Sequence, residues 1–304
     1  MTVLAVSVVG LLLSGCAGEG SPVGASTKDG APTGDPFDVF PSTDLKAVNI
    51  ALWTMEYQCF AESGFPEFLE VLPGMKADGF RIAGGGLSYD GLVVSANEPL
   101  WFQDQNDAAR RGFGVLGAGW PDMPAFVEVH DKAFSAVQDQ CEQKAYQKLG
   151  GATAIRQQVG DLAHNMFAPV QSLKKDDLQD KVFVCLESVG FKTTKTGPQV
   201  NSFYGRDLGI SLGASVKPAL PIPNNKIRVQ IFPAVKVAKY VPTAEEVKMA
   251  VAMYDCSVKT GARAEYAKRL YDAKVKAVAA NEATLTELKP KIEAMVKAAA
   301  ALSL

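Results

Sequence analysis

The sequence has only two histidines and lacks the short motifs that mark common hydrolases and nucleotide-binding enzymes. Ser88 and Ser135 lie in no Gly-x-Ser-x-Gly elbow. Gly84-Gly85-Gly86 is not followed by the Lys-Ser/Thr pair of a phosphate-binding P-loop, which favours a simple turn. His130 falls on the apolar stripe of a predicted helix and is expected to be structural, while His164 with Asp161 is expected to be a solvated pair. We therefore predict no catalytic residue, no cofactor and no metal site.

Strong net charge and long apolar runs are also missing. The formal net charge is −2, which argues against nucleic acid as a partner. Residues 3–13 are apolar apart from Ser7, a length typical of a signal-peptide core and too short to span a bilayer. No later stretch is apolar enough for a transmembrane helix. The pattern predicts export rather than insertion.

The first of the five cysteines stands apart from the other four. Cys16 closes the run Leu12-Leu13-Ser14-Gly15-Cys16, which resembles the lipobox where bacterial signal peptidase II cuts and the cysteine is lipidated. No Lys or Arg precedes Leu12, so either the start lies upstream or the amino terminus alone supplies the expected positive charge. We predict a signal peptide over residues 1–15 and lipidation of Cys16, which would place the chain on the outer face of the cytoplasmic membrane.

Residues 16–42 are rich in Gly, Ser, Pro, Thr and Asp and contain almost no large apolar residue. Such a segment cannot bury enough surface to offset the entropy lost on ordering, so we predict a flexible tether. Diacylation at Cys16 would hold this tether to the membrane, and a second acylation at the new amino terminus would make the anchor more secure.

Apolar residues recur at helical spacing in five later segments, and glycine-rich segments separate them. We predict helices over residues 45–63, 124–149, 174–189, 243–259 and 262–302. Thr243 to Glu246 has the pattern of a capping box, and Pro290 is expected to kink or split the last stretch. Residues 73–121 and 200–241 predict loops and short strands, with an alternating strand over residues 227–231. The predicted fold class is mainly α with small β elements and long C-terminal helices.

The two halves of the chain look related. Each contains a helical Cys followed by Gly-Phe, then an aromatic-Gly step, then a second helix with a second Cys. The matching residues are Cys59, Gly64, Phe65, Phe113, Gly114 and Cys141 in one half and Cys185, Gly190, Phe191, Tyr204, Gly205 and Cys256 in the other. We predict similar halves over residues 43–170 and 171–304.

Four cysteines allow three disulfide connectivities. A duplication favours Cys59–Cys141 and Cys185–Cys256, because each pair then closes one half. An exported protein is expected to hold such cysteines oxidised. Each disulfide closes a long loop and is expected to stabilise the folded state by on the order of 4 kcal/mol.

These features together resemble a group of uncharacterised cell-envelope lipoproteins of actinobacteria, in which a lipobox and a tether precede duplicated Cys-x4-Gly-Phe or Cys-x4-Gly-Tyr helices. The resemblance rests on Cys16, the segments Cys59–Phe65 and Cys185–Phe191, the aromatic-Gly steps and the second cysteines. It implies the location, the disulfides and an α-rich fold. The resemblance implies no enzymatic activity and no functional residue.

Three aromatic residues in the loop-rich part of the first half are candidates for a ligand surface. Trp101, Phe102 and Trp120 could form a platform for a glycan or peptide, and the alternative is that they pack over the helices. We expect a non-enzymatic envelope module that binds a cell-wall component or a membrane-protein partner. The alternative is an envelope hydrolase that acts on peptidoglycan or glycan.

Overall fold

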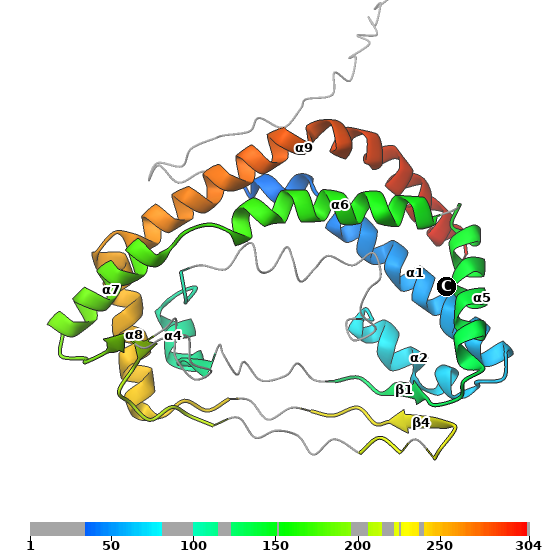
Figure 1. The fold of residues 1–304 in the computed structure, drawn as a ribbon, viewed down its shortest axis with the longest axis horizontal. Helices are drawn as coiled ribbons and strands as arrows, with labels where there is room; N and C mark the ends of the chain where they lie inside the picture. Colours follow the sequence, from blue (N-terminus) through cyan, green and yellow to red (C-terminus); the bar gives the residue numbers. More distant parts are fainter. Residues whose placement is uncertain are drawn as a thin grey trace, which may run out of the picture. The chain divides into compact units, whose positions relative to one another are not determined.

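The computed structural model describes residues 34–80, 100–114, 123–150, 152–195, 206–214, 222–224, 226–236 and 240–302. The chain divides into two units, Met1–Asp35 and Pro36–Leu304. The described part of the second unit is mainly helical with two small antiparallel sheets (Figure 1), which confirms the predicted fold class.

The elements occur in the order η1 (Pro36–Val39), α1 (Ser42–Glu62), α2 (Glu67–Asp78), α4 (Gln105–Arg111), β1 (Phe126–Val129), α5 (Phe134–Lys148), α6 (Ala152–Gln171), α7 (Asp176–Ser188), β2 (Thr194–Lys195), β3 (Arg206–Asp207), β4 (Val229–Phe232), α8 (Ala244–Lys259) and α9 (Ala262–Ala301). The predicted helices over residues 45–63, 174–189 and 243–259 correspond to α1, α7 and α8. The capping box of α8 is present, with Thr243 and Glu246 each accepting a hydrogen bond from the other's backbone N–H.

A kink or a split was expected at Pro290, and the split does not occur, because α9 continues from Ala262 to Ala301 through the proline. Proline removes one backbone hydrogen bond from a helix. Leu288 and Ile292, on either side of it, are buried in the core that α9 shares with α6 and α1. Packing of this apolar face keeps the helix continuous, and Figure 1 shows α9 running beside α6.

The start of the predicted helix over residues 124–149 is also wrong. Phe126–Val129 forms β1, which pairs antiparallel with β4, and α5 begins only at Phe134. Phe126 lies opposite Phe232, and their rings stack at a centroid distance of 4.7 Å. A short apolar run fits either a strand or a helix, and a partner strand distant in sequence decides between them here. The predicted strand over residues 227–231 is β4, displaced by one to two residues.

Three helices were not predicted. α2 and α4 occupy parts of the segment expected to form loops, and α2 contains Pro73 before it ends at Gly79 with a positive φ of 67°. α6 has a regular apolar stripe that the sequence does display. Its members are Val159, Leu162, Ala163, Met166, Phe167 and Val170, all buried.

The predicted tether extends too far at its carboxyl end. Phe37 and Phe40 are both 3% exposed and meet Phe167 of α6 edge to face, at centroid distances of 5.0 and 6.1 Å. Lys274 of α9 lies over the Phe37 ring, with Nζ 5.3 Å from the centroid. The folded unit therefore begins at Pro36, and residues 16–33 of the predicted tether lie outside the described residues.

Both predicted disulfides are present, Cys59–Cys141 between α1 and α5 and Cys185–Cys256 between α7 and α8. The turn after each first cysteine has the same backbone geometry. Gly64 and Gly190 have φ of 100° and 98°, and the following phenylalanine donates its N–H to a carbonyl of the last helical turn at 3.0 and 3.1 Å. These junctions support the local part of the predicted duplication.

The halves do not fold separately, because segments of each pack on the other. Residues 100–113 of the first half share a core with α7 and α8 of the second. Conversely, β4 of the second half pairs with β1 and contacts α2. Pro36–Leu304 accordingly forms one unit rather than two domains.

Candidate functional site

The predicted aromatic ligand surface is not formed by Trp101 or Phe102. Trp101 is 6% exposed and Phe102 is fully buried. The Trp101 ring packs against Phe183 of α7 at a centroid distance of 5.8 Å, and Phe102 lies 6.1 Å from Phe113. The prediction of a platform is wrong for these two residues, and the alternative of packing over the helices holds. Trp120, Gly84–Gly86 and Ser88 lie outside the described residues.

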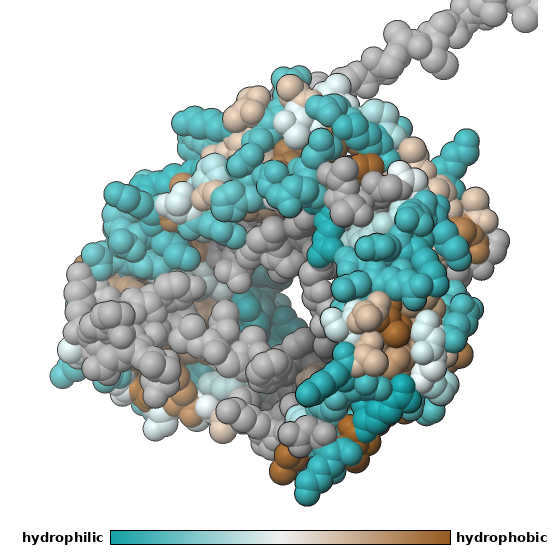
Figure 2. Space-filling model, turned by 45° about the vertical axis from the view of Figure 1, so that its right-hand side comes forward, coloured by the Kyte–Doolittle hydropathy of each residue, from teal (hydrophilic) through white to brown (hydrophobic). Residues whose placement is uncertain are grey.

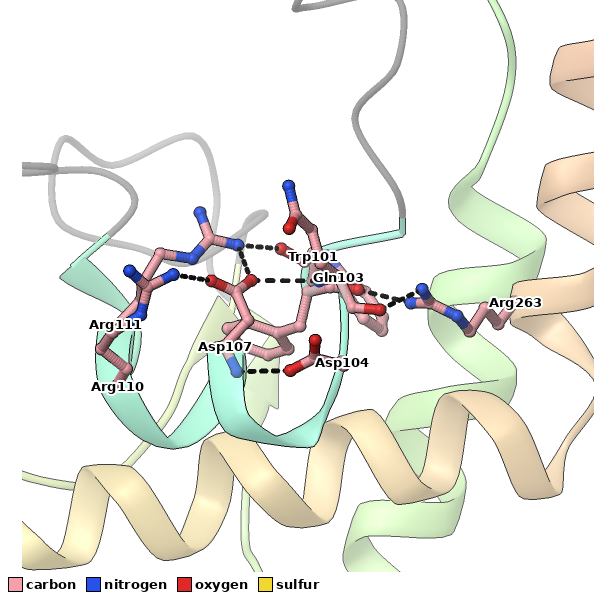
Figure 3. Close-up of polar contacts among 8 residues, drawn as sticks. Trp101, Gln103, Asp104, Asp107, Arg110, Arg111 and Arg263 are labelled. Carbon is pink, nitrogen blue, oxygen red and sulfur yellow. Dashed lines mark hydrogen bonds and ion pairs between the residues drawn. The ribbon is translucent and has the colours of Figure 1, made fainter. Parts of the chain in front are cut away.

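A polar cluster around Asp107 holds these aromatic residues in place (Figure 3). Asp107 is 5% exposed and accepts hydrogen bonds from the Gln103 N–H at 3.0 Å, Arg111 Nη2 at 2.6 Å and Arg110 Nη2 at 2.9 Å. Burial by itself would raise the pKa of Asp107, but the hydrogen bonds from Gln103 and Arg111 outweigh it and hold the pKa below the usual 3.8.

The arginines of this cluster are engaged with the protein itself. Arg111 also donates to the carbonyl oxygen of Trp101 at 3.0 Å. From the other side, Arg263 of α9 donates to the carbonyl oxygens of Phe102 and Gln103. These contacts fasten residues 101–103 between α4 and α9, so we assign the cluster a structural role.

A second buried carboxylate, Glu246, joins three segments that are distant in sequence. Glu246 is fully buried and accepts hydrogen bonds from the N–H groups of Phe113 at 2.5 Å and Gly213 at 2.7 Å. The Tyr240 hydroxyl donates to it at 2.7 Å, and the Thr243 N–H lies 3.3 Å away. Burial, followed by the bond to Glu246, raises the pKa of Tyr240. The carboxylate predicted only as a helix cap is thus the centre of an internal network.

The two histidines do not come together. His130 follows β1 instead of lying on a helix, and its Nε2 is 3.7 Å from Oε1 of Glu128. His164 and Asp161 are both exposed on α6, where Asp161 accepts a hydrogen bond from Gln157 at 2.8 Å. Ser135 is exposed in the first turn of α5. In the part of the chain that the structure describes, no three metal-ligating side chains gather.

Glu56 is a buried carboxyl that the sequence analysis missed. It lies on α1, is 7% exposed, and burial raises its pKa to about 7, with the Glu142 carboxylate adding to the rise and Arg156 opposing it. The position could have been noticed, because Glu56 falls on the same helical stripe as Leu52 and Cys59.

An open groove of about 550 Å³ lies between α2 and the end of the β1–β4 ribbon. The ribbon continues there as a bridge in which Met123 and Val235 exchange two backbone hydrogen bonds of 2.9 Å. On the opposite wall, Gly74 of α2 leaves open space where a side chain would stand. The lining residues are Glu70, Val71, Gly74, Ala77, Asp78, Met123, Pro124, Ala125, Ala234, Val235 and Lys236.

The groove is apolar along most of its length and has no aromatic residue in its lining. Glu56 is not among the lining residues, so the carboxyl with the raised pKa and the groove are separate features. Hydrophilic residues predominate on the face seen in Figure 2, where hydrophobic ones occur in small patches. The groove is therefore a candidate binding site among the described residues.

Comparison of the chain with protein-family models, curated proteins and solved structures finds no match. None of the described helices has the length and apolar character needed to cross a membrane.

Proposed function

We propose that the chain is a lipid-anchored binding module of the cell envelope, held outside the cytoplasmic membrane through Cys16. The observation that carries the proposal is the pairing of the cysteines: two disulfides use four of the five and leave Cys16. Disulfides persist in oxidising compartments. At about 3.5 Å per residue, the stretch from Cys16 to Pro36 would let the folded unit stand up to roughly 70 Å from its anchor.

The anchor is tested by expressing the full chain in a bacterium that has signal peptidase II and feeding an alkyne-labelled fatty acid. The wild-type chain should carry the label and sediment with membranes until detergent is added. Cys16→Ser should lose both properties, whereas Ser14→Ala, which keeps a small residue before the cysteine, should retain them. A wild-type chain without label, or Cys16→Ser still held on membranes as an integral protein, would refute the anchor.

We further propose that the groove binds an extended peptide segment of an envelope protein. Sugars are commonly bound on aromatic side chains, and the groove lining has none. The Met123–Val235 bridge places backbone from a strand pair beside an apolar wall, the arrangement used when a peptide adds to a sheet edge. Glu70 on one wall and Lys236 on the other offer charges of both signs, which suits the mixed charges of a protein segment.

This binding is tested with a library of fluorescent octapeptides that combine apolar residues with one acidic and one basic residue. Binders are selected against the wild-type chain, and their affinity is measured for Gly74→Leu, which fills the groove. Ala136→Leu places the same side chain at an exposed position of α5 that does not line the groove. We expect at least a tenfold loss of affinity for Gly74→Leu and none for Ala136→Leu. Equal affinities for all three proteins, or selection of glycans but not peptides in parallel arrays, would overturn the assignment.

A further inference from the structure

The first disulfide brings two glutamates to one junction. Glu56 lies one helical turn before Cys59 on α1, and Glu142 directly follows Cys141 on α5. The disulfide joins the two helices with the cysteine Cα atoms 5.6 Å apart, so opening of this junction means that the side-chain packing around the disulfide loosens while the covalent link remains. The Glu56 side chain is buried, whereas that of Glu142 is 39% exposed.

Arg156 of α6 is the cation that acts on both carboxyls. Its Nη1 lies 3.0 Å from Oε1 of Glu142 and 3.0 Å from the hydroxyl of Tyr146 on α5. Tyr57, beside Glu56 on α1, is also buried, and burial together with the Glu56 charge raises its pKa to about 12. One guanidinium thus acts on two carboxyls and is hydrogen-bonded to the Tyr146 phenol, so an ionised Glu56 is poorly compensated.

The second disulfide provides an internal comparison. Three residues before Cys185 stands Val182, where Glu56 stands before Cys59. Directly after Cys256 stands Ser257, where Glu142 follows Cys141. Val182 and Ser257 are both fully buried, and the Ser257 hydroxyl donates to the carbonyl oxygen of Tyr254 at 2.6 Å. A helix pair stapled in this way therefore needs no carboxyl at these positions, and buried ionisable groups without a structural need are candidates for function.

We propose that Glu56 is a proton-operated latch: protonated Glu56 lets α1 close on α5 and α6, and loss of the proton opens this junction but not the one at the second disulfide. A protein outside the cytoplasmic membrane meets the pH of its surroundings, so such a latch would report that pH through the mobility of α1 and α5.

The direction in which pH changes the stability of the closed junction follows from the raised pKa of Glu56. The closed junction holds the Glu56 proton with a pKa of about 7, against the usual 4.5 when the side chain is hydrated. Closing is fully favoured below the hydrated value and is lost as the pH rises through about 7. With these two values the equilibrium constant for opening rises about tenfold between pH 6 and pH 8.

Reduction of the two disulfides in one sample measures this opening. A dithiothreitol thiolate attacks one Sγ to give a mixed disulfide, and its second thiol displaces the cysteine, leaving two cysteine thiols and cyclic oxidised dithiothreitol. Thiols released at early times are alkylated and quantified by peptide mass spectrometry. The rate for Cys59–Cys141 is divided by that for Cys185–Cys256, which cancels the ionisation of the reagent.

We expect this ratio to rise about tenfold from pH 6 to pH 8 in the wild-type chain and to stay flat in Glu56→Gln. Glu142→Gln should keep most of the rise, because burial is the largest cause of the raised pKa of Glu56. This second variant also decides the matter if Glu56→Gln fails to fold. A flat wild-type ratio, an equal rise in Glu56→Gln, or a flat ratio in Glu142→Gln would overturn the latch.

Discussion

Gly112, Gly114 and Gly213 are glycines because other groups occupy the space where a Cβ would stand. A Cβ at Gly112 would lie 2.4 Å from Oε1 of Glu246, and one at Gly114 would lie 2.3 Å from the Tyr240 ring. At Gly213 the obstacle is the carbonyl oxygen of Val241, at 2.1 Å. The aromatic-Gly step of the first half is thus explained by close packing around the buried Glu246 network.

This explanation predicts opposite effects for two glycine-to-alanine substitutions. Gly114→Ala forces a methyl group into the Tyr240 ring and should lower the free energy of unfolding by about 2 kcal/mol. Gly74→Ala meets nothing within 4 Å and lies inside α2, so it should raise the free energy of unfolding by about 0.5–1 kcal/mol. Urea denaturation measures both. Equal effects of the two substitutions would contradict the packing account.

Residues such as Glu56 and Glu246 show what a single sequence conceals at this scale. The capping-box pattern predicts Glu246 as the third residue of a helix. The N–H groups that donate hydrogen bonds to its carboxylate, those of Phe113 and Gly213, come from segments far away in the chain and could not be predicted. The disulfide pairing was predictable because the same order of motifs, a cysteine with Gly-Phe and later a second cysteine, occurs twice in the sequence. The sequence left burial of Trp101 as one of two alternatives, because the helices that cover it, α7 and α8, begin only at Asp176 and Ala244.

At the scale of the element, local pattern and tertiary packing disagree at two places. The short apolar run of β1 is compatible with either a helix or a strand, and it forms a strand because β4 pairs with it. α9 contains a proline that should stop a helix, yet the helix continues because its apolar face is covered. α6 is a different case, because the helix was not predicted although its regular apolar stripe is present in the sequence.

Pro290 should therefore lower the free energy of unfolding, and the packing of α9 compensates for this loss. The residue is exposed, so Pro290→Ala restores a backbone hydrogen bond and loses little buried surface. After allowance for the greater freedom of the unfolded chain, we expect the free energy of unfolding to rise by about 1–2 kcal/mol. Lys289→Ala, at the neighbouring exposed position, is the control and should change it by less than about 0.5 kcal/mol. If the Pro290→Ala protein is no more stable than this control, Pro290 does not destabilise α9.

At the scale of the whole molecule, the halves predicted over residues 43–170 and 171–304 are not separate folding units. Trp101 and Phe102 of the first half are buried in the core formed with α7 and α8 of the second half. β4 of the second half pairs with β1 of the first half. α9 also covers α1 and α6. Removing either half would uncover apolar surface of the other.

The chain from Pro36 to Leu304 should consequently unfold in one cooperative transition. Residues 36–170 expressed alone lose β4 and α9, so we expect a fragment with broad melting and no near-ultraviolet circular dichroism. Calorimetry of the full unit and circular dichroism of the fragment test this. A fragment that melts sharply, or two resolved transitions in the full unit, would contradict the interlocked arrangement.

We propose that Cys16 anchors the protein while the other four cysteines form its disulfides, and mass spectrometry of the protein extracted from membranes, both intact and after proteolysis without reduction, tests both parts. We expect a mature chain that starts at Cys16 with a diacylglyceryl group on its sulfur, together with peptides joined as Cys59–Cys141 and Cys185–Cys256. A chain with an unmodified Cys16, or one in which Cys16 or Cys59 is joined to Cys185, would contradict it.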